Sequence, residues 1–133
     1  MPAPLPCPCG LRADYAHCCG ALHQAFAAGQ GLTAATPEAL MRSRYAAFVL
    51  DLREYLLATW HASTRPPALE APEPGLKWLG LEVRHAALQD ADHGTVAFVA
   101  RSKLGGRAHR LQETSRFVRE GGAWFYVDGD LKN

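Results

Sequence analysis

The first part of the chain has apolar residues at helical spacing. Leu22, Ala25 and Phe26 are related as i, i+3 and i+4, and Gly29 follows as a C-terminal stop. The sequence therefore predicts a short helix over residues 15–28.

A second helix has a clear start signal. Thr36 is a good N-cap, Pro37 suits the first helical position, and Glu38 faces the positive end of the helix dipole. The apolar stripe that follows consists of Met41, Tyr45, Phe48, Val49 and Leu52. This stripe predicts that the helix packs on another layer of the fold.

A third helix is expected over residues 52–60. Its inward side chains would be Tyr55, Leu56 and Trp60, and prolines between residues 66 and 74 predict a loop after it.

After Gly75 the period of the pattern changes from helical to two. Leu79, Leu81 and Val83 alternate with polar or small residues, which is typical of a strand. Three further strands are expected, at residues 95–101, 111–119 and 123–128, separated by turn residues that include two Gly-Gly pairs. Helices followed by a four-stranded antiparallel meander give an α+β class.

Composition limits the function classes. The chain has 133 residues and a formal net charge of +1, so it presents no broad field for nucleic acid or anionic lipid. The start, MPAPLPCPCG, lacks the apolar core of a secretory signal, and no apolar run reaches the length of a membrane span. We therefore expect a cytoplasmic protein without a membrane segment.

The cysteines gather at the front of the chain. Cys7, Cys9, Cys18 and Cys19 have the spacing C-x-C, eight residues, C-C, and two close pairs of thiolates satisfy the tetrahedral shell of one structural Zn²⁺. Arg12 and the start of the first helix would offset part of the negative charge.

The same four cysteines are compatible with different roles. They could be unrelated buried residues, or Cys18 and Cys19 could have a redox role. His17 or His23 could replace one thiolate in the metal shell.

The last two expected strands predict a candidate ligand pocket. A two-residue turn at Gly121-Gly122 sets Phe117 opposite Tyr126 and Ser115 opposite Asp128. If this face meets the helices, it forms an aromatic floor with carboxylates at one end, which is typical of small-molecule sites. The candidate pocket residues are Arg42, Tyr45, Trp60, His61, Glu113, Ser115, Trp124, Tyr126 and Asp128.

Two classes of function fit this pocket. The first is a binding or adaptor protein without turnover, and the second is a lyase or isomerase with Asp128 or Glu113 as general base and His61 or Tyr126 as its acid partner. Each of these residues could equally have a purely structural role, such as an arginine pairing with Asp128.

The segment CPCGLRADYAHCC resembles the SEC-C motif of the preprotein translocase motor SecA, which has the form CPCGSGKKYKKCH or CPCGSGKKYKKCC. The resemblance implies zinc ligands at Cys7, Cys9, Cys18 and Cys19. In the motor this module contacts a chaperone and the ribosome, which implies a protein partner here. The chain differs at Leu11, where serine is usual, and at Arg12 and Ala13, where basic residues dominate.

The remainder of the chain resembles the YchJ family. The segments that carry the resemblance are TPEALMRSRYAAF, YLLATWHASTRP, WLGLEV and ETSRFVREGGAWFYVDG. It implies a SEC-C zinc knuckle over residues 1–29 and a nuclear transport factor 2-like, or cystatin-like, domain over residues 30–133. In that fold helices cover a curved four-stranded sheet and enclose a cone-shaped cavity.

The resemblance implies no activity. We expect a zinc-containing binding or adaptor protein that recognises a protein partner or a small ligand. Domains of this fold often pair through the open sheet face, so a homodimer is also expected. Apolar groups on both faces of the sheet would come from Val96, Phe98, Val99, Val118, Phe125 and Val127, and an apolar outer face is a candidate interface.

Overall fold

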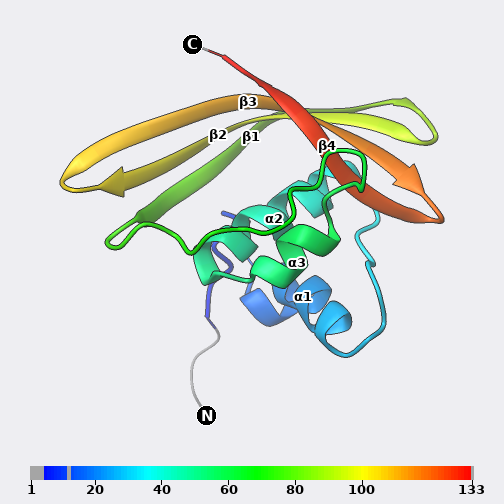
Figure 1. The fold of residues 1–133 in the computed structure, drawn as a ribbon, viewed down its shortest axis with the longest axis horizontal. Helices are drawn as coiled ribbons and strands as arrows, with labels where there is room; N and C mark the ends of the chain where they lie inside the picture. Colours follow the sequence, from blue (N-terminus) through cyan, green and yellow to red (C-terminus); the bar gives the residue numbers. More distant parts are fainter. Residues whose placement is uncertain (1–4, 12, 133) are drawn as a thin grey trace.

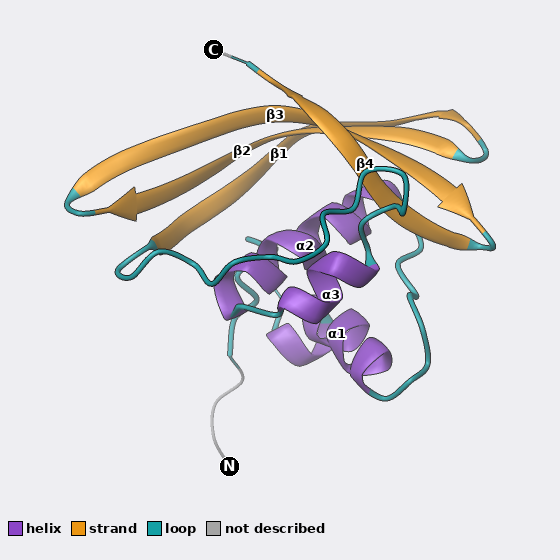
Figure 2. Cartoon of the chain, viewed as in Figure 1, coloured by secondary structure: helices purple, strands orange, loops and turns teal. Residues whose placement is uncertain are grey.

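The computed structural model describes residues 5–11 and 13–132. Within these residues, helices come first and a four-stranded antiparallel sheet follows, so the predicted α+β class is confirmed (Figures 1 and 2). The elements are a 3₁₀ turn (Tyr15–His17), α1 (Cys19–Ala27), α2 (Pro37–Leu50), α3 (Arg53–Ala58), β1 (Lys77–Asp90), β2 (His93–Leu104), β3 (Arg107–Glu120) and β4 (Ala123–Leu131). None of the described helices is both long and apolar enough to cross a bilayer.

Helix α2 is the central helix of the fold. The Thr36 hydroxyl accepts a hydrogen bond from the Ala39 amide at 3.0 Å, which confirms the predicted N-cap. The helix contacts α1 and α3 on one side and β1, β2 and β4 on the other. Figure 1 shows it between the curved sheet and the other helices. Most of its residues are therefore buried, including the polar Ser43 and Arg44.

The strands pair in the order β1-β2-β3-β4 and are longer than the sequence predicts. The Gly105-Gly106 and Gly121-Gly122 pairs form the expected hairpin turns, where positive φ angles favour glycine. In β1 the register shifts between Trp78 and Gly80, so Leu79 is an extra residue and is exposed. The shift turns Trp78 toward the helices.

A second bulge makes part of the predicted register wrong. Phe117 pairs with Tyr126 as expected, but Ser115 pairs with Gly129, and Asp128 pairs with Arg116. One extra residue in β4 at this point moves the following side chains to the opposite face. Asp128 therefore lies on the face of the sheet that is turned away from the helices.

The outer face of the sheet carries several charged pairs. Glu82 lies near Arg84 and Arg101, and Arg116 pairs with Asp128 and Asp130. Val96 and Phe98 belong to the core, and Val99 is fully buried. The homodimer stays a prediction, and the outer face that it would use carries these ion pairs.

Candidate functional site

The cysteine sulfurs form a tight cluster. The Sγ atoms of Cys7, Cys9, Cys18 and Cys19 all lie within 4.8 Å of one another, and Cys9 and Cys18 are 3.6 Å apart. A tetrahedral Zn²⁺ with Zn–S bonds of about 2.3 Å separates its sulfurs by about 3.8 Å. The donor set and its spacing therefore fit a zinc ion.

Backbone hydrogen bonds shape the loop that carries these ligands. The Cys7 amide donates to the Ala13 carbonyl at 3.0 Å, and the Tyr15 amide donates to the Leu5 carbonyl at 2.7 Å. Helix α1 begins at Cys19 with Cys18 as its N-cap, so this cysteine pair lies at the positive end of the helix dipole. The charge-offsetting role predicted for Arg12 lies outside the described residues.

The two candidate histidine ligands have other partners. His17 pairs with Asp14 at 2.6 Å. His23 donates from Nε2 to the Ser43 carbonyl at 2.8 Å, so its Nδ1 accepts from the Tyr15 hydroxyl at 2.5 Å. All the cysteines are free thiols in the described residues, so the arrangement favours four sulfur ligands.

Hydrogen bonds within the cluster make it easier to deprotonate the first cysteine. The hydrogen bond from the Cys19 thiol is the main cause that lowers the pKa of Cys9 to about 4. The same bond raises the pKa of Cys19, and burial raises that of Cys18 to about 11. Binding a metal to every sulfur must therefore release protons.

The cysteine cluster also packs on the rest of the chain. Cys7, Cys9 and Cys19 form a buried group with Ala46 of α2, and Leu81 of β1 packs against this group. We call the segment 5–27 the knuckle. Arg42 joins the two parts because its guanidinium donates to the Cys9 carbonyl at 2.9 Å and pairs with Glu38 at the same distance.

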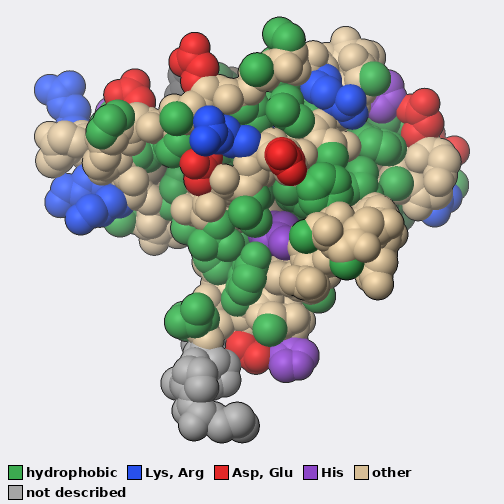
Figure 3. Space-filling model, turned by 60° about the horizontal axis from the view of Figure 1, so that its bottom comes forward, with side chains coloured by type: hydrophobic (Ala, Val, Ile, Leu, Met, Phe, Trp, Pro, Cys, Tyr) green, Lys and Arg blue, Asp and Glu red, His purple; other side chains and the backbone are tan. Residues whose placement is uncertain are grey.

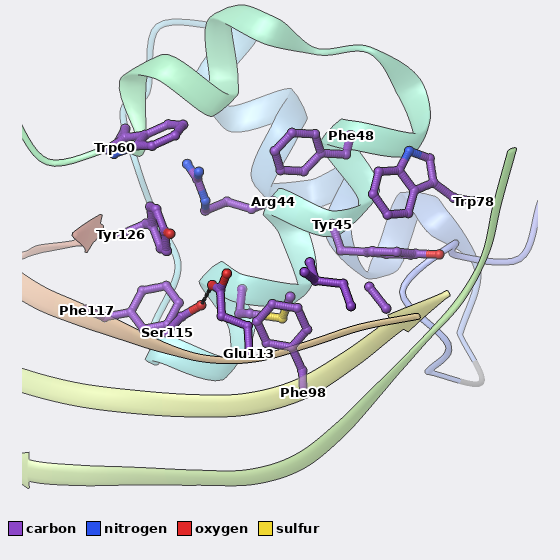
Figure 4. Close-up of a pocket in the computed structure, with 13 residues that line it drawn as sticks. Arg44, Tyr45, Phe48, Trp60, Trp78, Phe98, Glu113, Ser115, Phe117 and Tyr126 are labelled. Carbon is purple, nitrogen blue, oxygen red and sulfur yellow. Dashed lines mark hydrogen bonds between the residues drawn. The ribbon is translucent and has the colours of Figure 1, made fainter. Parts of the chain in front are cut away.

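A separate cavity of about 180 Å³ lies between α2 and the inner face of the sheet. Figure 3 shows hydrophobic side chains gathered where the helices meet the sheet. The lining residues, drawn in Figure 4, are Met41, Arg44, Tyr45, Phe48, Trp60, Trp78, Phe98, Ala100, Leu111, Glu113, Ser115, Phe117 and Tyr126. The wall is therefore mostly aromatic and apolar, with few polar groups.

Arg44 supplies the positive charge of this cavity. Its side chain is almost fully buried and donates from one terminal nitrogen to the Leu56 carbonyl at 2.8 Å and to the Thr59 hydroxyl at 2.6 Å. The guanidinium lies over the rings of Tyr126 and Trp60, at 4.6 and 5.2 Å from their centres. Burial lowers the pKa of Arg44 to about 10, so the group stays charged at neutral pH.

Glu113 supplies the negative charge from the opposite wall. Its carboxylate accepts a hydrogen bond from the Ser115 hydroxyl (Figure 4). The neighbouring Gly129 leaves room for it, because a Cβ there would lie 2.5 Å from the Glu113 Oε2. Glu113 forms no ion pair with Arg44, although both line the same cavity.

The candidate pocket residues divide between the cavity and other places. Five of them line the cavity: Tyr45, Trp60, Glu113, Ser115 and Tyr126. Four others lie elsewhere: Arg42 holds the knuckle, His61 pairs with Glu120, Trp124 belongs to the core, and Asp128 pairs with Arg116 at 2.6 Å on the outer face. The cavity therefore contains one candidate base, Glu113, instead of two.

Sequence reasoning missed Arg44. A signal was present, since Arg44 lies three residues after Met41 and four before Phe48, within the apolar stripe of the helix. A charged residue inside such a stripe is unusual unless it has a buried partner or a functional role.

Known families match both the cysteine knuckle and the domain that contains the cavity. The family model "YchJ, middle NTF2-like domain" matches residues 36–129, and the SEC-C motif matches residues 5–21. The chain belongs to the YchJ family. A UPF0225 protein of Methylibium petroleiphilum is 64% identical over 129 residues, which cover 97% of this chain and 90% of that protein. A UPF0225 protein of Bordetella parapertussis is 52% identical over 130 residues, covering 98% and 96%.

Solved structures show the same fold in relatives of this YchJ-family chain. A SEC-C motif containing protein from Rhodopseudomonas palustris matches with a TM-score of 0.81 and 32% identity, covering 97% of this chain and all of the other. One from Psychrobacter arcticus matches with a TM-score of 0.78 and 28% identity, covering 96% and 83%. The predicted nuclear transport factor 2-like fold is thus confirmed.

Proposed function

We propose that this protein is a cytoplasmic binding protein that holds a small organic molecule in the cavity between α2 and the sheet, while its knuckle carries one structural zinc ion. The observation that carries the proposal is the pair of opposite charges, Arg44 and Glu113, inside an aromatic wall. Apolar pockets with a few converging polar groups are the usual form of small-molecule sites. The free thiols of the knuckle suit a reducing compartment.

Zinc would be held by the thiolates of Cys7, Cys9, Cys18 and Cys19 and would cross-link the loop to α1. Metal analysis of purified protein should find about one zinc per chain. Protein that contains no metal after purification in zinc-supplemented medium would refute this part of the proposal. A protein partner that contacts the knuckle is a further expectation, carried by the resemblance to the translocase motor.

The cavity is tested with benzyl alcohol, a neutral molecule with one ring. Its addition should shift the NMR signals of side chains that line the cavity. Ala100→Phe should abolish the shifts because Ala100 lines the cavity, whereas Ala97→Phe on the outer face should leave them unchanged. Shifts that are identical in both variants, or absent in the parent protein both for benzyl alcohol and for zwitterionic molecules of similar size, would refute the binding function.

The enzyme alternative rests on Glu113 and Tyr126, which both line the cavity. Burial, followed by the charge of Glu113, raises the pKa of Tyr126, so the phenol stays protonated and could act as the acid partner. Asp128 and His61 have no place in this version because both have partners outside the cavity. Mass spectrometry of a bound molecule before and after incubation separates the two functions, since turnover changes its mass or its fragments.

A further inference from the structure

The charges in the cavity restrict the chemistry of what can bind there. Arg44 is buried and forms no ion pair with a carboxylate among the described residues. Its two hydrogen bonds go to neutral oxygens and use one terminal nitrogen, so Nε and the other terminal nitrogen keep their N–H donors. A buried guanidinium in this state attracts an anionic acceptor strongly, because solvent screens it little.

Glu113 has the complementary property. It accepts one hydrogen bond, from Ser115, and a carboxylate has further lone pairs to offer. Because Glu113 and Arg44 do not pair directly, each can contact a different end of one molecule. A purely anionic ligand would pair with Arg44 but would be repelled by Glu113. A purely cationic ligand would pair with Glu113 but would be repelled by Arg44.

The size and polarity of the rest of the cavity restrict the ligand further. An apolar cavity of about 150 Å³ in another protein holds benzene, so about 180 Å³ here accommodates a molecule of roughly that size or slightly larger. Phe48 and Trp78 lie side by side in the cavity wall, with ring centres 6.0 Å apart (Figure 4), and Phe48 is 41% exposed. Their aromatic rings offer mainly apolar contacts.

We propose that the ligand is a small zwitterion of the amino-acid type with an apolar side chain. Its carboxylate contacts the free N–H groups of Arg44, its ammonium group contacts Glu113, and its side chain lies against Phe48 and Trp78. A net neutral ligand leaves the buried charges balanced, which neither a simple acid nor a simple amine achieves. This inference rests on the proposed binding function and specifies its ligand class.

The test compares molecules that differ by one charged group. L-leucine is titrated against 4-methylpentanoate, which lacks the amine, and 3-methylbutylamine, which lacks the carboxylate, with calorimetry and NMR as readouts. Leucine should bind about 10- to 100-fold more tightly than either, because each analogue leaves one buried charge unpaired. Valine and phenylalanine extend the series to smaller and larger side chains.

Variants assign the two ends of the ligand. Arg44→Gln should reduce leucine affinity about 10- to 100-fold and leave 3-methylbutylamine binding much less affected, whereas Glu113→Gln should spare 4-methylpentanoate. Arg116→Gln and Glu82→Gln, matched changes on the outer face, should change none of these affinities.

The outcomes separate this inference from the proposed function. If benzyl alcohol binds but the amino acids bind no better than their analogues, the zwitterion is wrong and the binding function stands. If neither benzyl alcohol nor any amino acid binds, both are wrong. The comparison among ligands uses the unaltered protein, so it gives a result even if a variant fails to fold.

Discussion

Removing the metal should destabilise the whole protein without unfolding it. The knuckle is packed on α2 and β1 through Ala46 and Leu81, and the Cys9 carbonyl accepts a hydrogen bond from Arg42. Loss of zinc, by chelation or by Cys9→Ser, should loosen residues 5–27 and break these contacts. The domain beyond them retains its own core, so it should remain folded at room temperature.

The size of the effect follows from the contacts. A hydrogen bond from a charged donor contributes about 1.5–3 kcal/mol, and the partial exposure of Ala46 and Leu81 costs about 1–2 kcal/mol more. The sum, about 2.5–5 kcal/mol, is smaller than most of the range of about 5–15 kcal/mol for whole domains. For a chain of this length it lowers Tm by about 10–20 °C.

Thermal unfolding followed by tryptophan fluorescence measures this change, because the tryptophans all lie beyond the knuckle. Arg42→Gln provides the control: it should lower the stability of the metal-bound protein and have a much smaller effect on the metal-free protein. Because Arg42→Gln also removes the ion pair with Glu38, Glu38→Gln measures the contribution of that pair separately. An unchanged Tm on metal removal, complete unfolding, or an equal effect of Arg42→Gln in both states would each refute this reasoning.

Three further predictions concern single residues, and a fourth concerns the oligomeric state. Asp128→Asn should shift Tm by less than about 3 °C and leave ligand binding unchanged, because its pair with Arg116 is about half exposed. Gly129→Ala should cost about 1–3 kcal/mol in urea unfolding and weaken ligand binding, since the new methyl group displaces Glu113. Burial lowers the pKa of His23, so stability should be complete above about pH 6.5 and fall below it, with a weaker pH dependence in His23→Gln. Light scattering at high concentration tests the homodimer, which a monomer mass would contradict.

Local signals were sufficient for the elements and for the clustering of the four cysteines. The Thr36-Pro37 start of α2, the Gly-Gly hairpin turns and the clustered cysteines each act over a few residues, and each was found where the sequence predicts it.

Features that depend on the surroundings of an element were harder to predict. Helix α2 is buried on nearly all sides, so its apolar stripe does not reveal that Ser43 and Arg44 also face inward. Ser43 is satisfied by Tyr55 of α3 at 2.7 Å, a contact between residues that no helical spacing relates. The extra residue at Leu79 has a local marker, since Gly80 interrupts the strand pattern beside it, but the glycine alone does not tell at which residue the register shifts.

The bulge in β4 determines the chemistry of the cavity. With a regular register, Asp128 would enter the cavity opposite Ser115, and two carboxylates would face the single charge of Arg44. Such a site favours a cation or a shared proton, as in catalysis by paired carboxylates. The bulge moves Asp128 to the outer face and sets Gly129 opposite Ser115, where its missing side chain leaves space for Glu113. One inserted residue therefore leaves a cavity with one charge of each sign, which favours binding of a neutral, dipolar molecule over acid–base catalysis by a carboxylate pair.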